Sequence, residues 1–150
     1  MTLGEMQIEA FQFDVETATF RYITESWSGA GWDFSFHARC RDAACQAMFP
    51  EGALLRTEAA PLPLRQTEDY TGVEVAAALA YDDESGEPFF GLMVGEEHEV
   101  SHLQLKFLER DGERYLIEIN AQVTPTVFGH SATLKLRAWT QQLPDHAYPT

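Results

Sequence analysis

The residues with the clearest chemical potential are His98, Glu99 and His102, which match the spacing His-Glu-x-x-His. On a helix, this spacing places two imidazoles on one face, where they hold a zinc ion while the glutamate activates a zinc-bound water. Such a site would make the protein a zinc-dependent hydrolase, with Glu118 as the nearest candidate for a third ligand. The hypothesis depends on whether the motif is helical.

The apolar pattern after the motif indicates a strand instead. Leu103, Leu105 and Phe107 alternate with polar residues, whereas on a helix Leu105 would project to nearly the opposite side from the other two. Asp111-Gly112 then precedes a second alternating run, and Asp-Gly between two such runs is the strongest short-range signal of a β-hairpin. We therefore expect the motif to lie on the approach to a hairpin, without the helical platform that the zinc site needs.

A second candidate metal site combines His37 with Cys40 and Cys45. Thiolates and imidazoles are typical zinc ligands, but a structural zinc site takes four ligands and no fourth is evident here. A disulfide between the cysteines requires their Cα atoms to come within about 7 Å, and a reducing cytoplasm favours two free thiols. We therefore predict no metal and no cofactor.

Two acidic stretches flank the apolar segment 89–94. Neither has the regular spacing of a calcium-binding loop, and both fall in predicted connections, where binding residues tend to lie. A continuous strand over 89–94 would hold the stretches at opposite ends, whereas a reversal at Gly91 would bring them together. We predict a partner-binding surface that consists of these acids and Trp27, an aromatic anchor; the acids are Asp82, Asp83, Glu84, Glu87, Glu96, Glu97 and Glu99.

The net charge restricts the class of partner. The chain has 24 Asp and Glu against 10 Lys and Arg, a formal charge of −14. Nucleic acid is excluded as a partner, because its affinity comes largely from cationic groups that displace counterions. The same charge favours fast capture of a basic partner, although the alternative that it only serves solubility remains open. A membrane span is also excluded, because no apolar run approaches the roughly 18 residues required.

Period-two alternation of apolar side chains dominates the rest of the chain. The irregular parts are a bulge or doubly buried strand near Ala10, a turn over 26–31 and an exposed connection over 59–65, where Pro61 and Pro63 lack backbone N–H groups. Asp42 is expected to cap one short helix that ends at Met48. We predict strands over residues 6–15, 17–24, 32–40, 73–81, 103–107, 115–123 and 132–139, with an eighth over 89–94 if that segment does not reverse at Gly91.

These patterns predict an all-β or β-rich α+β fold. We expect an antiparallel sandwich or curled sheet of about seven or eight strands with at most one short helix. Residues 1–150 form a single domain in this prediction, and residues 141–150 form a tail that frays.

The expected function is that of a non-enzymatic acidic binding protein that occludes a basic protein partner. Its most concrete version is a toxin-neutralising immunity or antitoxin protein, located in the cytoplasm as a monomer or homodimer, because the chain combines small size with a charge of −14 and no coherent catalytic site. The zinc-dependent hydrolase is the alternative. A further alternative is an accessory or assembly domain that pairs with a partner through a β-edge.

Overall fold

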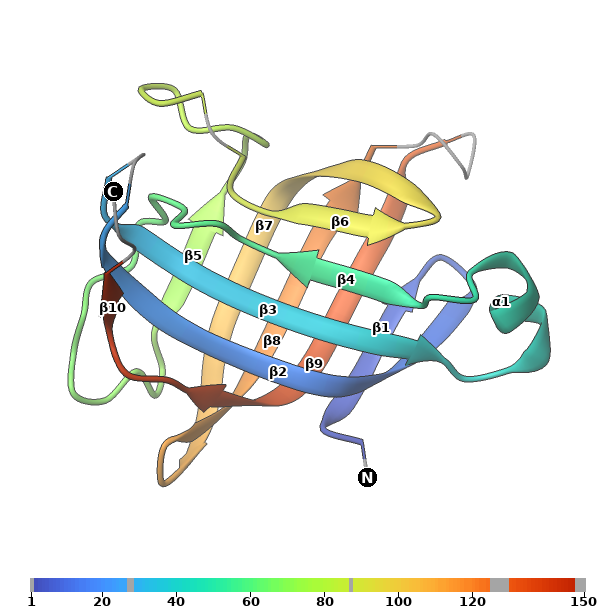
Figure 1. Ribbon diagram of the computed structural model, residues 1–150, viewed down its shortest axis with the longest axis horizontal. Coiled ribbons are helices and arrows are strands. Elements are labelled where there is room, and N and C mark those ends of the chain that lie inside the picture. Colours follow the sequence, from blue (N-terminus) through green and yellow to red (C-terminus); the bar gives the residue numbers. More distant parts are fainter. Residues whose placement is uncertain (1, 27–28, 87, 125–129, 148–150) are drawn as a thin grey trace.

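In this computed structural model, the described residues 2–26, 29–86, 88–124 and 130–147 form a barrel of strands with one short helix (Figure 1). Within these ranges, no helix has the length and apolar composition of a membrane span. The helix is α1 (Ala43–Met48), and the strands are β1 (Gly4–Ile8), β2 (Phe11–Glu25), β3 (Gly31–Cys40), β4 (Ala53–Arg56), β5 (Glu74–Ala77), β6 (Gly91–Val94), β7 (Glu96–Asp111), β8 (Arg114–Val123), β9 (Ala132–Gln142) and β10 (His146–Ala147).

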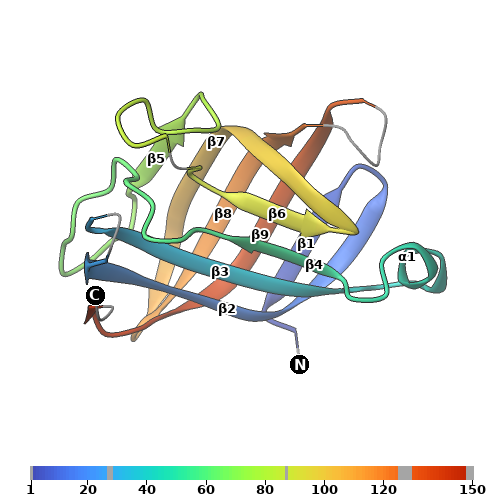
Figure 2. The same cartoon turned by 45° about the horizontal axis from the view of Figure 1, so that its top comes forward.

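The strands close into a barrel. Eight of them follow the order β1-β9-β8-β7-β6-β4-β3-β2, and β2 pairs with β1 to complete the circuit, while β5 and β10 are additional strands on β7 and β2 (Figures 1 and 2). All neighbours in this circuit are antiparallel. The all-β prediction with one short helix is confirmed, but the expected open sandwich or curled sheet is corrected to a closed barrel.

Closure leaves little unpaired sheet edge. Among the described strands, only β5 and β10 have a single neighbour, and they contain four and two residues. Short edge strands of this kind offer few backbone groups to a strand from another chain. The architecture therefore gives little support to pairing with a partner through a β-edge.

Inward-facing side chains fill the barrel, as in other small barrels. The predicted strand over 32–40 is confirmed by β3, in which Trp32, Phe34, Phe36, Ala38 and Cys40 are all buried. Alternate residues of β8 and β9 face the same interior. The barrel core is thus built from period-two patterns, and a cluster of aromatic rings surrounds Phe20 at what we call the aromatic end.

The connection over 59–65 differs from the expected exposed loop. It forms neither helix nor strand, as its prolines require. However, Leu62 and Leu64 are buried, and the indole of Trp32 donates a hydrogen bond to the Leu64 carbonyl at 3.0 Å. The segment therefore closes the aromatic end of the barrel with its apolar side chains.

The irregularity expected near Ala10 is a hairpin, and neither a bulge nor a strand buried on both faces. Ile8 pairs with Phe11 across the two-residue turn Glu9-Ala10, and Glu9 has a φ of 55°. The bulge lies further on, between Val15 and Thr17. A turn without glycine, asparagine or proline carries no local signal, which explains the error.

The C-terminal segment is paired through Ala147, in contrast to the frayed tail expected from residue 141. β9 continues to Gln142, and the amide of Leu143 donates to the Phe20 carbonyl at 2.8 Å. β10 then runs parallel to β2. The remaining residues of the predicted tail, 148–150, lie outside the described part of the chain.

The predicted cap of the short helix is confirmed, because the Asp42 carboxylate accepts a hydrogen bond from the amide of Cys45 at 2.9 Å. This turn brings the Cα atoms of Cys40 and Cys45 to 5.4 Å, and a disulfide joins them. The expectation of two free thiols is thereby corrected. Because both sulfurs are bonded to each other, the proposed zinc site with His37 has no thiolate ligands.

Candidate functional site

The second acidic stretch lies on a strand, not in a connection. β6 extends to Val94, the chain reverses at Gly95, and β7 returns antiparallel so that Glu99 faces Gly91 across the pair. The reversal is therefore at the far end of the apolar segment and not at Gly91. It still brings Glu99 back to the start of β6, which the first acidic stretch precedes.

The motif His98-Glu99-x-x-His102 is extended, as its apolar pattern predicted. His98 is buried, and its Nδ1 and Nε2 atoms each lie 3.2 Å from a carbonyl oxygen, those of Thr124 and Val94. His102 is exposed at a β-bulge, where its φ is 51°. One imidazole thus lies inside the barrel with both nitrogens engaged, and the other lies outside.

The positions of His98 and His102 do not support a zinc site at this motif. Glu118, the candidate third ligand, pairs with Lys106 in the β7–β8 ladder and lies 3.9 Å from Arg137. Within the ranges that the structure describes, no group of three or more His, Cys, Asp or Glu side chains is arranged to hold a metal ion.

The first acidic stretch forms the tip of a narrow loop. An isolated bridge between Tyr81 and Pro88 closes the base of this loop. The Asp82 carboxylate accepts hydrogen bonds from the amide and hydroxyl of Ser85, both at 2.9 Å, and these lower the pKa of Asp82. Asp83 and Glu84 are exposed, so the tip presents carboxylates to solvent. Trp27 and Glu87, also expected in the binding surface, lie outside the described residues.

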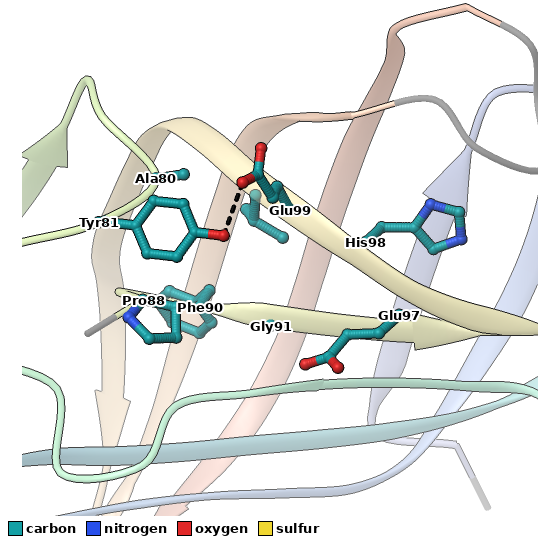
Figure 3. Close-up of a pocket in the computed structure, with 9 residues that line it drawn as sticks. Ala80, Tyr81, Pro88, Phe90, Gly91, Glu97, His98 and Glu99 are labelled. Carbon is teal, nitrogen blue, oxygen red and sulfur yellow. Dashed lines mark hydrogen bonds between the residues drawn. The ribbon is translucent and has the colours of Figure 1, made fainter. Parts of the chain in front are cut away.

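A pocket of about 250 Å³ separates the base of this loop from the β6–β7 hairpin (Figure 3). Glu97 and Glu99 project from the same face of β7, as alternate residues of a strand do. The Tyr81 hydroxyl donates a hydrogen bond to Glu99 at 2.6 Å. Gly91 forms part of the lining, and the Glu97 carboxylate extends over it, 3.7 Å from where a Cβ would lie.

The charge of this pocket is negative, and we call it the acidic pocket. Arg56, which faces Gly91 from the neighbouring strand β4, pairs with Glu58 at 3.1 Å. Glu97 and Glu99 have no salt bridge among the described residues. Two carboxylates beside an aromatic ring suit an ammonium or guanidinium group, which gains charge-assisted hydrogen bonds and contact with the ring.

Replacing Glu99 by glutamine is expected to bring the pKa of Tyr81 down toward its ordinary value. The hydrogen bond to the Glu99 carboxylate is the main cause that raises the pKa of Tyr81, followed by burial and the nearby charge. Folding raises the pKa of Tyr81, so the protonated phenol stabilises the folded state. This contribution to the free energy of unfolding is complete at pH values below the unfolded-state pKa of Tyr81. It is lost as pH rises through the folded-state pKa. Difference absorbance titrations of each protein against its Tyr81→Phe counterpart isolate this phenol.

Tyr70 provides a control in the titration of each protein before the Tyr81→Phe counterpart is subtracted. Burial is the main cause that raises the pKa of Tyr70, so Glu99→Gln should leave it unchanged. A Tyr81 titration that does not move in Glu99→Gln would contradict the hydrogen bond.

Comparisons with known proteins do not extend this description: no protein-family model matches the chain, and no curated protein or solved structure is significantly similar to it. The functional conclusion therefore rests on the geometry of the site. Two parts of that geometry were missed in the sequence, the roles of Tyr81 and Gly91. A glycine within an apolar strand signals close approach of another group and was the available clue to Gly91.

Proposed function

We propose that this protein is a non-enzymatic binding protein that holds a basic segment of a partner protein against its acidic face. We define the acidic face as the loop tip with Asp82, Asp83 and Glu84 together with the exposed residues Glu96, Glu97 and Glu99 at the start of β7. The observation that carries the proposal is the pocket between them, where two carboxylates on one strand face lie beside the Tyr81 ring. The most concrete version is an immunity or antitoxin protein that covers the cationic active site of a toxin.

Electrostatics favours this proposal in two ways. The charge of −14 accelerates encounter with a basic partner, and complementary potentials select it over acidic competitors. Each exposed ion pair contributes only about 0.2–1 kcal/mol, so the affinity must come from several carboxylates that act together. Binding should therefore weaken steeply with added salt.

The test measures binding of a fluorescein-labelled octaarginine peptide by fluorescence anisotropy over a range of salt concentrations. The triple variant Glu96→Gln, Glu97→Gln and Glu99→Gln is expected to weaken binding by about tenfold and to reduce its salt dependence, because three small ion-pair contributions are lost. The glutamine amide oxygen can still accept a hydrogen bond from Tyr81, one that is weaker than the bond to a carboxylate, so the local structure is retained while the charge is lost.

The matched control is Glu109→Gln, Asp111→Asn and Glu113→Gln, at the other end of β7 and its hairpin. These side chains are exposed, and the control changes the net charge by the same amount. It is expected to change affinity by less than about twofold. Equal losses in the two triple variants would mean that only total charge matters, and would support the solubility interpretation instead.

A further inference from the structure

A second hollow lies on the same wall of the barrel, at the other end of β6. Its volume is about 520 Å³, and we call it the methionine groove. Residues from the end of α1, the turn that follows, and the outer faces of the neighbouring strands line it, among them Met48, Glu51, Leu54 and Met93. Figures 1 and 2 both place the β6–β7 turn on the same side of the barrel as α1.

The methionine groove exposes two large hydrophobic side chains. Only four large hydrophobic side chains are exposed in the described part of the chain. Two of them, Met48 and Met93, line this groove, with 54% and 47% of their surface exposed, and a third, Tyr81, lines the acidic pocket. Exposed apolar side chains gathered in hollows mark interaction sites, and methionine adapts its shape to different apolar partners.

The groove is continuous with the acidic face. His37, Leu54, Met93 and Glu97 are successive partners across β3, β4, β6 and β7, so they form one row on the outside of the barrel. Glu97 of the acidic pocket is thus the direct neighbour of Met93. Along β6, Gly91 in the pocket and Met93 in the groove are two residues apart, which is about 7 Å in an extended chain.

Charge identifies the occupant. Glu51 lines the groove, and Glu97 lies beside it. Arg39, two residues after His37 on β3, is paired with Glu16 at 2.9 Å. A second copy of this chain would bring another charge of −14 to the same place and be repelled. The complementary occupant is therefore a segment with basic and apolar residues.

We propose that the methionine groove seats an apolar side chain of the basic segment whose cationic side chain enters the acidic pocket, an inference that rests on the proposed function. The spacing of about 7 Å matches residues i and i+2 of an extended peptide, which point to the same side. The recognised pattern is thus a cation, any residue, and an apolar residue, in an extended segment.

The test compares two labelled peptides, Lys-Lys-Arg-Ala-Leu-Ala-Lys-Lys and the same peptide with alanine in place of leucine. The leucine peptide is expected to bind about fivefold more tightly, because the groove buries part of its side chain. In the double variant Met48→Gln and Met93→Gln, the two peptides should bind with equal affinity. The salt dependence of binding should be the same as in the native protein. The control Leu79→Gln removes an exposed apolar side chain outside the groove and should preserve the difference.

The possible failures are distinguishable. Equal affinities for the two peptides in the native protein, or a leucine preference that survives Met48→Gln and Met93→Gln, would overturn the groove proposal while the charge-dependent binding stands. If the triple substitution of Glu96, Glu97 and Glu99 leaves the affinity for both peptides unchanged, the proposed function itself is overturned. Sedimentation that shows a dimer disrupted by Met48→Gln and Met93→Gln would assign the groove to a second copy and overturn the proposed occupant.

Discussion

Replacing Phe20 by alanine is expected to lower the free energy of unfolding by about 3–5 kcal/mol, the range for a buried phenylalanine whose removal leaves a cavity. Phe20 is only 1% exposed and stands at the centre of the aromatic end of the barrel. Five rings surround it with centroids at 5.4–6.5 Å, those of Trp32, Phe34, Tyr70, Phe107 and Tyr115. These rings come from several strands and one connection, so they cannot collapse together into the vacated space.

Urea unfolding followed by tryptophan fluorescence measures this loss. Leu79→Ala is the control, because Leu79 is 60% exposed and its truncation should change the free energy of unfolding by less than about 0.5 kcal/mol. A loss below about 1 kcal/mol in Phe20→Ala, with an unchanged denaturant slope, would show that the surrounding rings do repack. It would contradict a rigidly filled interior.

The strands that the sequence predicted well are those in which one face is buried along the whole length. Residues 32–40 alternate without interruption and form β3. The hairpin of β7 and β8 was also predicted, although its turn is centred on Gly112 and Glu113 because Asp111 pairs with Arg114. In these segments the local pattern agrees with the tertiary environment, so the period-two alternation of apolar side chains is enough to predict the strand.

Barrel closure could not be predicted, because it depends on contacts between distant parts of the chain. β1 has only five residues, yet it lies between β9 and β2 and joins the two ends of the circuit. The short strand β5 was overestimated as 73–81, because Leu79 and Tyr81 continue the alternation although both are exposed. Alternation shows which residues share a face, not whether that face is covered.

The acidic stretches were recognisable in the sequence, but their arrangement was not. On a regular strand His98 and His102 would share a face, since they are four residues apart. The bulge at residues 101–104 shifts the parity, so Val100 and Leu103 are both buried while His102 turns outward. That shift was visible in the sequence, because Val100 has an even residue number whereas Leu103, Leu105 and Phe107 have odd ones. The pairing of Tyr81 with Glu99 had no such signal, because 18 residues separate them.

Replacing Gly52 by alanine is expected to lower the free energy of unfolding by about 3 kcal/mol, through two separate effects. Gly52 connects α1 to β4 with a φ of 74°, where an L-residue costs about 1–2 kcal/mol. In addition, a Cβ at this position would collide with the backbone carbonyl oxygen of Ala38 on β3. Relieving that collision requires backbone shifts, which cost about 1–3 kcal/mol.

Gly72→Ala separates the two effects. Gly72 has a similar φ of 83°, but a Cβ there would have no neighbour within 4 Å, so its loss should be limited to the conformational cost of about 1–2 kcal/mol. Urea unfolding of both variants measures the difference, and equal losses would mean that β3 and the turn after α1 can move apart freely. Because Gly52 lines the methionine groove, a larger loss in Gly52→Ala would show that close backbone packing fixes the wall on which that groove is built.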